Sequence, residues 1–216
     1  MTGSMASSGE SQRVRDIFER EAPKYDRQIG FFEKVLFGGG REWVCSQAEG
    51  EVLEIASGTG RNLPFYPPSV RLTMTEFTPA MLELARRRQA ELGREAELLE
   101  GDAQQLDFPD ERFDTVVCTL GLCTIPDDRA AVREVRRVLR PGGRFLLLEH
   151  VRSPRRAIRA VQHALDPLAV RFQGDHIARE PLEHLRAEGF AVERLERSKL
   201  GIVERVTARR PARVAD

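Results

Sequence analysis

The chain has 216 residues, enough for about one domain at roughly 150 residues per domain, with room for a lid or a small lobe. Hydrophobic residues make up 41% of the sequence, so the chain can bury an ordinary core. The 34 Lys and Arg residues balance the 34 Asp and Glu residues, and the formal net charge of +0 argues against a basic coat for nucleic acid. We therefore expect no nucleic-acid partner, although a local basic patch is compatible with this balance.

No apolar run approaches the roughly 18 residues of a membrane span, so we expect no integral membrane protein. Residues 1–9 are small and polar, without the apolar core of a secretory signal, and we expect a flexible tail there. The three cysteines, Cys45, Cys118 and Cys123, are odd in number and lack zinc spacing. We expect buried thiols, no metal site, and a reduced cytoplasmic setting.

Residues 10–48 are expected to form a helical lid made of two short amphipathic helices. The first ends near Pro23, since proline breaks a helix interior, and glycines at 38–40 interrupt the second. The apolar positions behind this prediction are Val14, Ile17, Phe18, Phe31, Phe32, Val35 and Leu36. Because both helices precede the first strand, we expect them to close over a ligand site.

From residue 49 onward, short apolar runs alternate with helical patterns. Strands are predicted at residues 51–55, 70–75, 96–99, 115–118 and 144–148, with helices at 79–92 and 127–139. The segment 140–143, Arg-Pro-Gly-Gly, predicts a helix stop and a turn before the fifth strand. This alternation is typical of an α/β doubly wound, mostly parallel sheet.

The C-terminal part is expected to complete the sheet. A helical insert at 152–177 is followed by a helix at 181–188 and by a strand pair at 190–195 and 202–208, which makes seven strands in a domain spanning 49–210. The insert has an apolar stripe at Ile158, Val161, Leu165, Leu168 and Phe172, with arginines at 152, 155, 156 and 159. We expect the apolar side to pack on the core and the arginines to be solvated; contact with anionic lipid is the alternative.

Residues 52–63 combine a strand, a glycine-rich turn and a helix start. Gly58 and Gly60 remove side chains where a ligand would approach the backbone, and the helix N-terminus offers unpaired N–H donors. A dinucleotide fingerprint would place a third glycine where Leu63 stands, which argues against a nucleotide oxidoreductase. A tight turn that binds nothing is the alternative at this point.

The ends of two further strands add hydrogen-bond acceptors. Glu76 ends the second strand, where a carboxylate can accept both ribose hydroxyls of an adenosine-containing ligand. Asp102 ends the third strand between Gly101 and Ala103, where it can accept the adenine amino group, and Phe77 can supply an apolar face for the base. Three consecutive strand ends therefore offer a backbone loop, a ribose acceptor and an adenine reader.

Together these pieces resemble the class I S-adenosylmethionine-dependent methyltransferases over about residues 20–208. The matching segments are 53–60, 76–82, 101–103, 113–118 and 138–149. Segments 118–125, 149–152 and 165–168 resemble the methyltransferase-like thiol methyltransferases. Tyr25-Asp26 resembles the lid of ubiquinone/menaquinone C-methyltransferases and phospholipid N-methyltransferases. The resemblance implies a Rossmann-like fold, S-adenosylmethionine as cofactor and S-adenosylhomocysteine as product.

The resemblance also implies a set of cofactor contacts. They are Tyr25, Glu54, Ala56, Ser57, Gly58, Gly60, Asn62, Glu76, Phe77, Met81, Gly101, Asp102, Ala103 and Thr119. Two positions depart from the family pattern. Ala56 stands where the first glycine of E-x-G-x-G-x-G is expected, and Glu76 stands where the second strand normally ends in Asp.

Methyl transfer needs alignment more than protein nucleophiles, because the cofactor itself is activated. His150 ends the fifth strand, where ligands of open α/β sheets bind, and is the candidate base or acceptor contact. Weaker candidates from the insert are His163, Asp166, Asp175 and His176. We expect the insert and the lid together to determine acceptor specificity.

The sequence thus predicts methyl transfer to a small-molecule S, O or N nucleophile, with that acceptor as the main partner. A phospholipid or quinone methyltransferase at a membrane surface is one alternative. A non-enzymatic cofactor-binding regulator is the alternative from another class.

Overall fold

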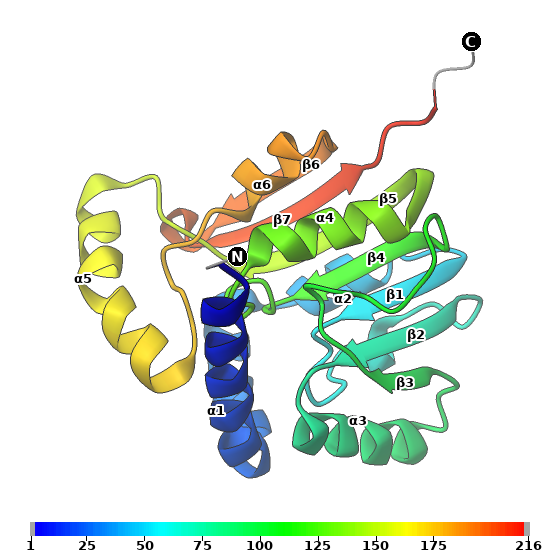
Figure 1. Ribbon diagram of the computed structural model, residues 1–216, viewed down its shortest axis with the longest axis horizontal. Coiled ribbons are helices and arrows are strands. Elements are labelled where there is room, and N and C mark those ends of the chain that lie inside the picture. The colour runs from blue at the N-terminus through cyan, green and yellow to red at the C-terminus, as the bar shows by residue number, and fades with distance from the viewer. Residues whose placement is uncertain (1–2, 214–216) are drawn as a thin grey trace.

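The computed structural model describes residues 3–213, with side chains from residue 9, and shows a seven-stranded sheet with helices on both sides (Figure 1). The strands are β1 (Glu51–Ile55), β2 (Arg71–Glu76), β3 (Glu97–Glu100), β4 (Phe113–Thr119), β5 (Leu139–His150), β6 (Ala191–Ser198) and β7 (Val203–Arg209). Their order is β3-β2-β1-β4-β5-β7-β6. The first five are parallel, and β6 and β7 close the sheet as antiparallel strands. The predicted doubly wound, mostly parallel fold is confirmed.

The helices follow the strands in the expected alternation. They are α1 (Gly3–Phe32), α2 (Gly40–Cys45), α3 (Pro79–Leu92), α4 (Asp128–Val138), α5 (Arg156–Gln173) and α6 (Pro181–Ala187), with single turns η1 (Glu33–Phe37), η2 (Leu63–Phe65) and η3 (Lys199–Gly201). Local chemistry sets their ends: Gly93, at φ 60°, ends α3, and the Asp127 carboxylate accepts the Ala130 N–H at 2.8 Å to cap α4. No helix within residues 3–213 has both the length and the apolar content that crossing a bilayer requires.

The core has two parts, one on each face of the sheet. Successive residues of β1 alternate between them, since a strand's side chains point to opposite faces. Leu53 and Ile55 pack in the cluster beneath α4 and α6, and Val52 packs in the cluster beneath α2. Among the described side chains, neither cluster contains a residue N-terminal to Leu36. The core of the sheet is therefore complete without α1.

The N-terminal segment differs from the prediction. Residues 3–32 form one continuous helix that includes Pro23, where we predicted a helix end, and residues 3–9 are its first turns rather than a flexible tail. Residues 1–2 of that predicted tail lie outside the described residues. An interior proline removes one helical hydrogen bond and its ring crowds the carbonyl four residues earlier, which favours a kink or an end. The contacts that α1 makes with α3 and α5 on either side hold the helix together across it.

Two other predictions are corrected. The predicted turn at 140–143 belongs to β5, because Leu139 already pairs with Phe113 of β4 and a bulge absorbs the extra residues. The apolar stripe of α5 does not pack on the core, and Gln162 is the helix's one buried residue among those described. The Gln162 amide donates to the Val151 and Ile177 carbonyls, so polar contacts rather than apolar packing hold α5 in place.

Candidate functional site

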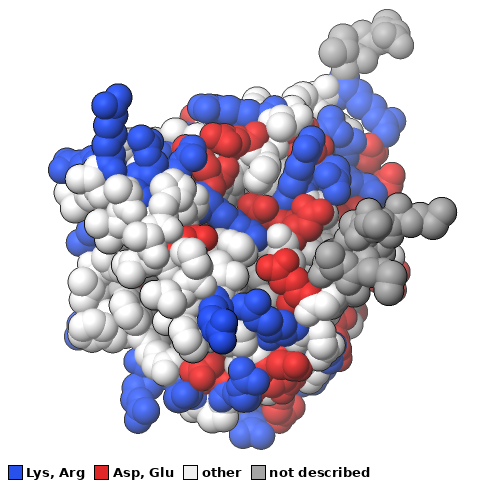
Figure 2. Space-filling view, turned by 60° about the vertical axis from the view of Figure 1, so that its left-hand side comes forward, with Lys and Arg blue, Asp and Glu red and all other residues white. Residues whose placement is uncertain are grey.

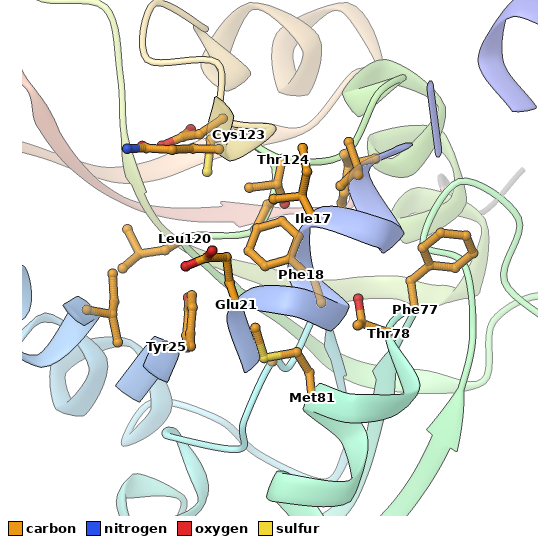
Figure 3. Close-up of a pocket in the computed structure, with 18 of the residues that line it drawn as sticks. Ile17, Phe18, Glu21, Tyr25, Phe77, Thr78, Met81, Leu120, Cys123 and Thr124 are labelled. Atoms are coloured by element: carbon orange, nitrogen blue, oxygen red, sulfur yellow. The ribbon is translucent and has the colours of Figure 1, made fainter. Parts of the chain in front are cut away.

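A cavity of about 830 Å³ lies between the carboxyl ends of the parallel strands and α1. Figure 3 shows Phe18, Glu21 and Tyr25 extending from α1 into this cavity, with Thr78 and Met81 approaching from the start of α3. Open α/β sheets bind ligands at this edge. The predicted cofactor residues that line the cavity are Tyr25, Ala56, Gly58, Glu76, Phe77, Met81, Gly101, Asp102 and Ala103.

Glu76 ends β2 with its side chain buried against the glycine turn. One carboxylate oxygen accepts the Gly58 N–H at 2.8 Å, and the other accepts the Thr78 N–H at 2.9 Å. Burial raises the pKa of Glu76, although these hydrogen bonds oppose the shift. Each carboxylate oxygen has a second lone pair, so Glu76 can still accept hydroxyl groups from the cavity.

Asp102 and Phe77 form the end of the cavity nearest to β3. The Asp102 carboxylate accepts the Gln104 backbone N–H at 2.8 Å and the Gln104 side-chain amide at 3.0 Å. The guanidinium of Arg15 in α1 lies 5.1 Å from the centroid of the Phe77 ring. A planar base beside Phe77 would therefore meet both an aromatic ring and a carboxylate.

Ala56, which departs from the family's glycine, has a left-handed backbone with φ 50°. Gly121, in the loop after β4, accommodates the extra methyl group. A Cβ on Gly121 would lie 2.8 Å from the Cβ of Ala56 and 3.0 Å from the Sγ of Cys118. Alanine thus replaces glycine at position 56 of the turn, and glycine at position 121 of the facing loop leaves room for its methyl group.

We expect Gly121→Ala to destabilise the protein by about 1–3 kcal/mol, because its methyl group has no space beside Ala56. The Ala56→Gly, Gly121→Ala double variant should recover part of that loss, since one of the two clashing methyl groups is gone. Denaturant unfolding of the four proteins in this cycle measures the coupling. Strictly additive effects would contradict the proposed compensation.

Five predicted cofactor residues lie behind the cavity wall instead of lining it. They are Glu54, Ser57, Gly60, Asn62 and Thr119, all buried. Three of them form a network in which the Asn62 amide donates to Glu54 at 2.9 Å and to Thr119 at 2.8 Å. Burial raises the pKa of Glu54 to about 7, opposed by hydrogen bonds from Tyr66 and Asn62. The network connects Asn62, just after the glycine turn, to β1 and β4.

Polar contacts fasten α1 over the cavity. The Asp26 carboxylate accepts the Thr59 hydroxyl at 2.6 Å and also pairs with Arg88 of α3. Near the end of the helix, Glu33 of η1 pairs with Arg61 at 2.6 Å. Tyr25 is adjacent to Asp26 and faces the cavity, and burial raises the pKa of its phenol. The phenol therefore stays protonated and can donate a hydrogen bond.

His150 ends β5, two strands along the sheet edge from the glycine turn after β1, and lines the cavity next to Asp175. The Nε2 of His150 lies 3.1 Å from the Asp175 carboxylate and 4.0 Å from that of Glu149. Burial alone would lower the pKa of His150, but Asp175 and Glu149 outweigh it and raise the pKa to about 9. Asp175 follows α5, so the insert and the last parallel strand meet at this pair.

Cys123 lies beside the same pair, and its sulfur, a His150 nitrogen and an Asp175 oxygen lie within 4.8 Å of one another. Three such atoms could hold a metal ion. Burial and the two neighbouring carboxylates raise the pKa of the Cys123 thiol. The three groups can therefore serve as a proton-transfer pair beside a neutral thiol, or as ligands of a metal ion that displaces the thiol proton.

The other candidates from the insert lie outside the cavity. His163 is exposed on α5, Asp166 accepts the Ala178 N–H at 3.1 Å, and His176 lies 3.8 Å from Asp166. Of the predicted insert candidates, Asp175 lines the cavity.

Several residues on α1 and in the loop after β4 line the cavity but were not predicted as cofactor contacts or catalytic residues. They include Ser11, Val14, Ile17, Phe18, Glu21, Leu120, Gly121, Thr124 and Ile125. The signal for the α1 residues was the helical spacing of positions 14, 17, 18, 21 and 25, which places all of them on one face. Because proline was expected to end that helix, positions before and after it were not read as one surface.

Comparison with known proteins agrees with this geometry. Residues 53–147 match a methyltransferase domain family. The chain is 41% identical over 118 residues to the phosphatidylethanolamine N-methyltransferase of Cereibacter sphaeroides, a match covering 54% of this chain and 58% of that enzyme. It is 32% identical over 177 residues to the thiol S-methyltransferase TMT1A of Homo sapiens, covering 80% of this chain and 72% of that enzyme.

A third relative is the demethylmenaquinone methyltransferase of Deinococcus radiodurans, 35% identical over 149 residues, covering 64% of this chain and 60% of that enzyme. The matches thus leave more than a third of the first and third relatives uncovered. Among solved structures, the fold is similar to that of an S-adenosylmethionine-dependent methyltransferase from Thermotoga maritima (TM-score 0.70, 22% identity, 90% of this chain and 99% of that one). A methyltransferase from Methanosarcina mazei is also similar (TM-score 0.62, 22% identity, 77% and 94%).

Proposed function

This chain belongs to the S-adenosylmethionine-dependent methyltransferases, and from that premise we propose that it methylates a small molecule at a sulfur, oxygen or nitrogen atom. One observation supports this most directly: Gly58, Glu76 and Asp102, from three successive strand ends, line the same cavity as His150. The first three residues suit an adenosine ligand. His150 lines another part of the cavity, where an acceptor would bind.

The residues fit the cofactor in size and in chemistry. The cavity volume is within the usual range for small-molecule sites, roughly 300–1,000 Å³. A Cβ at Gly58 would meet no atom within 4 Å, so the turn is open on the side that a ligand would approach. Glu76 would hold the ribose, and Asp102 and Phe77 the adenine. S-adenosylmethionine, when bound, supplies a methyl group on a sulfonium sulfur.

The chain's own part in the reaction is alignment and proton removal. S-adenosylmethionine held by Glu76, Asp102 and Phe77 would supply the methyl group to the acceptor atom, and His150 would take up the proton which that atom loses. The negative charges of Asp175 and Glu149 stabilise the imidazolium that forms. Tyr25 and the rest of α1 cover the cavity, which keeps acceptor and cofactor in line and excludes water.

A screen with labelled S-adenosylmethionine tests this function, with separate thiols, phenols, amines and lipids as acceptors. Formation of S-adenosylhomocysteine together with one labelled class of acceptor is the expected result. Cofactor binding without turnover on any of these classes would instead support a regulatory protein.

Glu76→Ala is expected to weaken S-adenosylmethionine binding by roughly 1.5–3 kcal/mol, because charge-assisted hydrogen bonds to the ribose are lost. Isothermal titration calorimetry measures the change. Glu91→Ala, at an exposed position of α3, is the matched control and should bind as the parent does. Unchanged affinity in Glu76→Ala would remove Glu76 from the ribose role.

A further inference from the structure

Helix α5 is an 18-residue helix that contacts α1 near its end and leaves most of its surface uncovered by the described residues. Figure 1 shows it standing beside the sheet rather than against it. The apolar side chains Val161, Leu165, Leu168 and Phe172 are 49–68% exposed. They follow one another at helical spacing and form one face, which we name the α5 apolar face. A face of this kind, left uncovered on a soluble domain, marks an interaction site.

Arginines lie near both ends of this helix. Arg155, Arg156 and Arg159 stand at the start of the helix and Arg171 near its end, and none of their side chains forms an ion pair with a described residue. The helix's one acidic residue, Asp166, accepts the Ala178 N–H instead of neutralising them. On this side of the molecule, Figure 2 shows a broad area without charged side chains and Lys or Arg at its upper edge.

The α5 apolar face is continuous with the mouth of the cavity. Phe172 belongs to that face and also lines the cavity. Phe32, at the end of α1, lines the same cavity and is 53% exposed, and its neighbour Phe31 is 69% exposed. Exposed aromatic side chains from two helices, Phe172 and Phe32, therefore line the cavity that an acceptor would enter.

We propose that α5 docks on an anionic membrane surface, and that a lipid-soluble acceptor enters the cavity from the membrane between α1 and α5. The α5 apolar face would lie among the acyl chains near the headgroups, and the arginines would meet lipid phosphates. A helix of this composition, apolar on one face and with arginines near both of its ends, is suited to lying in the interface plane. The statement about the acceptor rests on the function proposed above; the docking surface does not.

A second copy of the chain fits this surface less well than a membrane does. Pairing two α5 apolar faces would bring arginines of both copies together without acidic partners from the helix. It would also place the partner's helix at Phe172, across the entrance of the cavity. A membrane instead supplies negative charge to the arginines and a source of acceptor at the entrance.

Flotation with vesicles of phosphatidylcholine, with and without phosphatidylglycerol, tests the docking surface. We expect binding to the vesicles that contain phosphatidylglycerol and weaker binding at higher salt. Leu168→Glu should weaken binding about tenfold, whereas Leu92→Glu, at an exposed leucine of α3, should not. Arg155→Gln, Arg171→Gln, at the two arginines that flank the face, should weaken binding roughly 30-fold, and the control Arg86→Gln, Arg87→Gln on α3 should leave it unchanged.

Three results would overturn the docking proposal: no binding to anionic vesicles, equal losses in Leu168→Glu and Leu92→Glu, or a dimer in sedimentation that Leu168→Glu dissociates. The entry of the acceptor is tested with a lipid-soluble phenol or thiol in the vesicles. Leu168→Glu should slow its methylation about tenfold and leave that of a water-soluble analogue unchanged. Since vesicle binding is measured without any acceptor, and the water-soluble analogue is measured without vesicles, the docking surface and the proposed function can fail separately.

Discussion

Removing residues 1–30 is expected to abolish methyl transfer while leaving the sheet folded. The two core clusters contain no described residue before Leu36, so their packing is unchanged by the deletion. The deletion takes away Tyr25 and the α1 wall of the cavity, which then opens to water. Loss of alignment alone costs roughly 100-fold or more in rate. Circular dichroism and thermal unfolding, measured beside a turnover assay, separate loss of activity from loss of structure.

A smaller change tests the same lid without shortening the chain. Asp26→Asn removes the negative charge on α1 that pairs with Arg88 of α3 and accepts the Thr59 hydroxyl. It should raise the KM for S-adenosylmethionine about tenfold, because the closed lid becomes less populated. Asp16→Asn is the matched control, since Asp16 is exposed on the same helix and bonds to Gln12 within that helix. Full activity in the deleted protein, or equal effects of the two variants, would show that α1 does not act as a lid.

His150→Asn is expected to lower kcat by roughly 100-fold to 10,000-fold for a thiol or phenol acceptor, because asparagine cannot take up the acceptor's proton. Cofactor affinity should stay nearly constant, since His150 lies away from Glu76 and Asp102 along the sheet edge. His184→Asn, on α6 beside Asp128, is the control and should keep full activity. A kcat for His150→Asn within a fewfold of the parent value would exclude His150 as the base.

The pH dependence of the same reaction gives a second test. Asp175, Glu149, Asp166 and Cys123 are the titratable groups around His150, and the carboxylates among them raise its pKa to about 9. In the free enzyme the imidazole is then protonated at neutral pH. We expect kcat/KM to rise with pH through about 9, as His150 loses its proton and becomes able to accept another. In the bound complex the sulfonium charge should lower this pKa, so that kcat reaches its plateau at a lower pH than kcat/KM does.

Asp175→Asn distinguishes a positioning role from a purely structural one. Removing that carboxylate takes away the largest charge that favours the imidazolium, so the rise in kcat/KM should move to lower pH. With the same acceptor, any titration of the acceptor itself is common to both proteins and does not affect the comparison. If the profile of Asp175→Asn coincides with that of the parent, Asp175 does not tune His150.

The sequence by itself determined the sheet and one half of the site. Gly58, Glu76 and Asp102 were predicted together because each follows a buried strand directly, and the carboxyl ends of neighbouring parallel strands meet at one edge. Nothing distant in the chain is needed for that inference. The same holds for α3 and α4, whose periodicity and end signals are local.

The tertiary structure decided the other half of the site, because the conformation and exposure of α1 and α5 depend on which of their surfaces other elements cover. Contacts with α3 and α5 keep α1 helical through Pro23, against the local preference, and so place Tyr25 and Phe18 on one face toward the cavity. The pairing of His150 with Asp175 depends on the return of the chain after α5. The stripe on α5 is the plainest case: its spacing specifies an amphipathic helix, but the same spacing serves a helix packed on a core and a helix that faces outward. Only the position of α5 beside the sheet, with Gln162 as its buried anchor, shows that its apolar face is exposed.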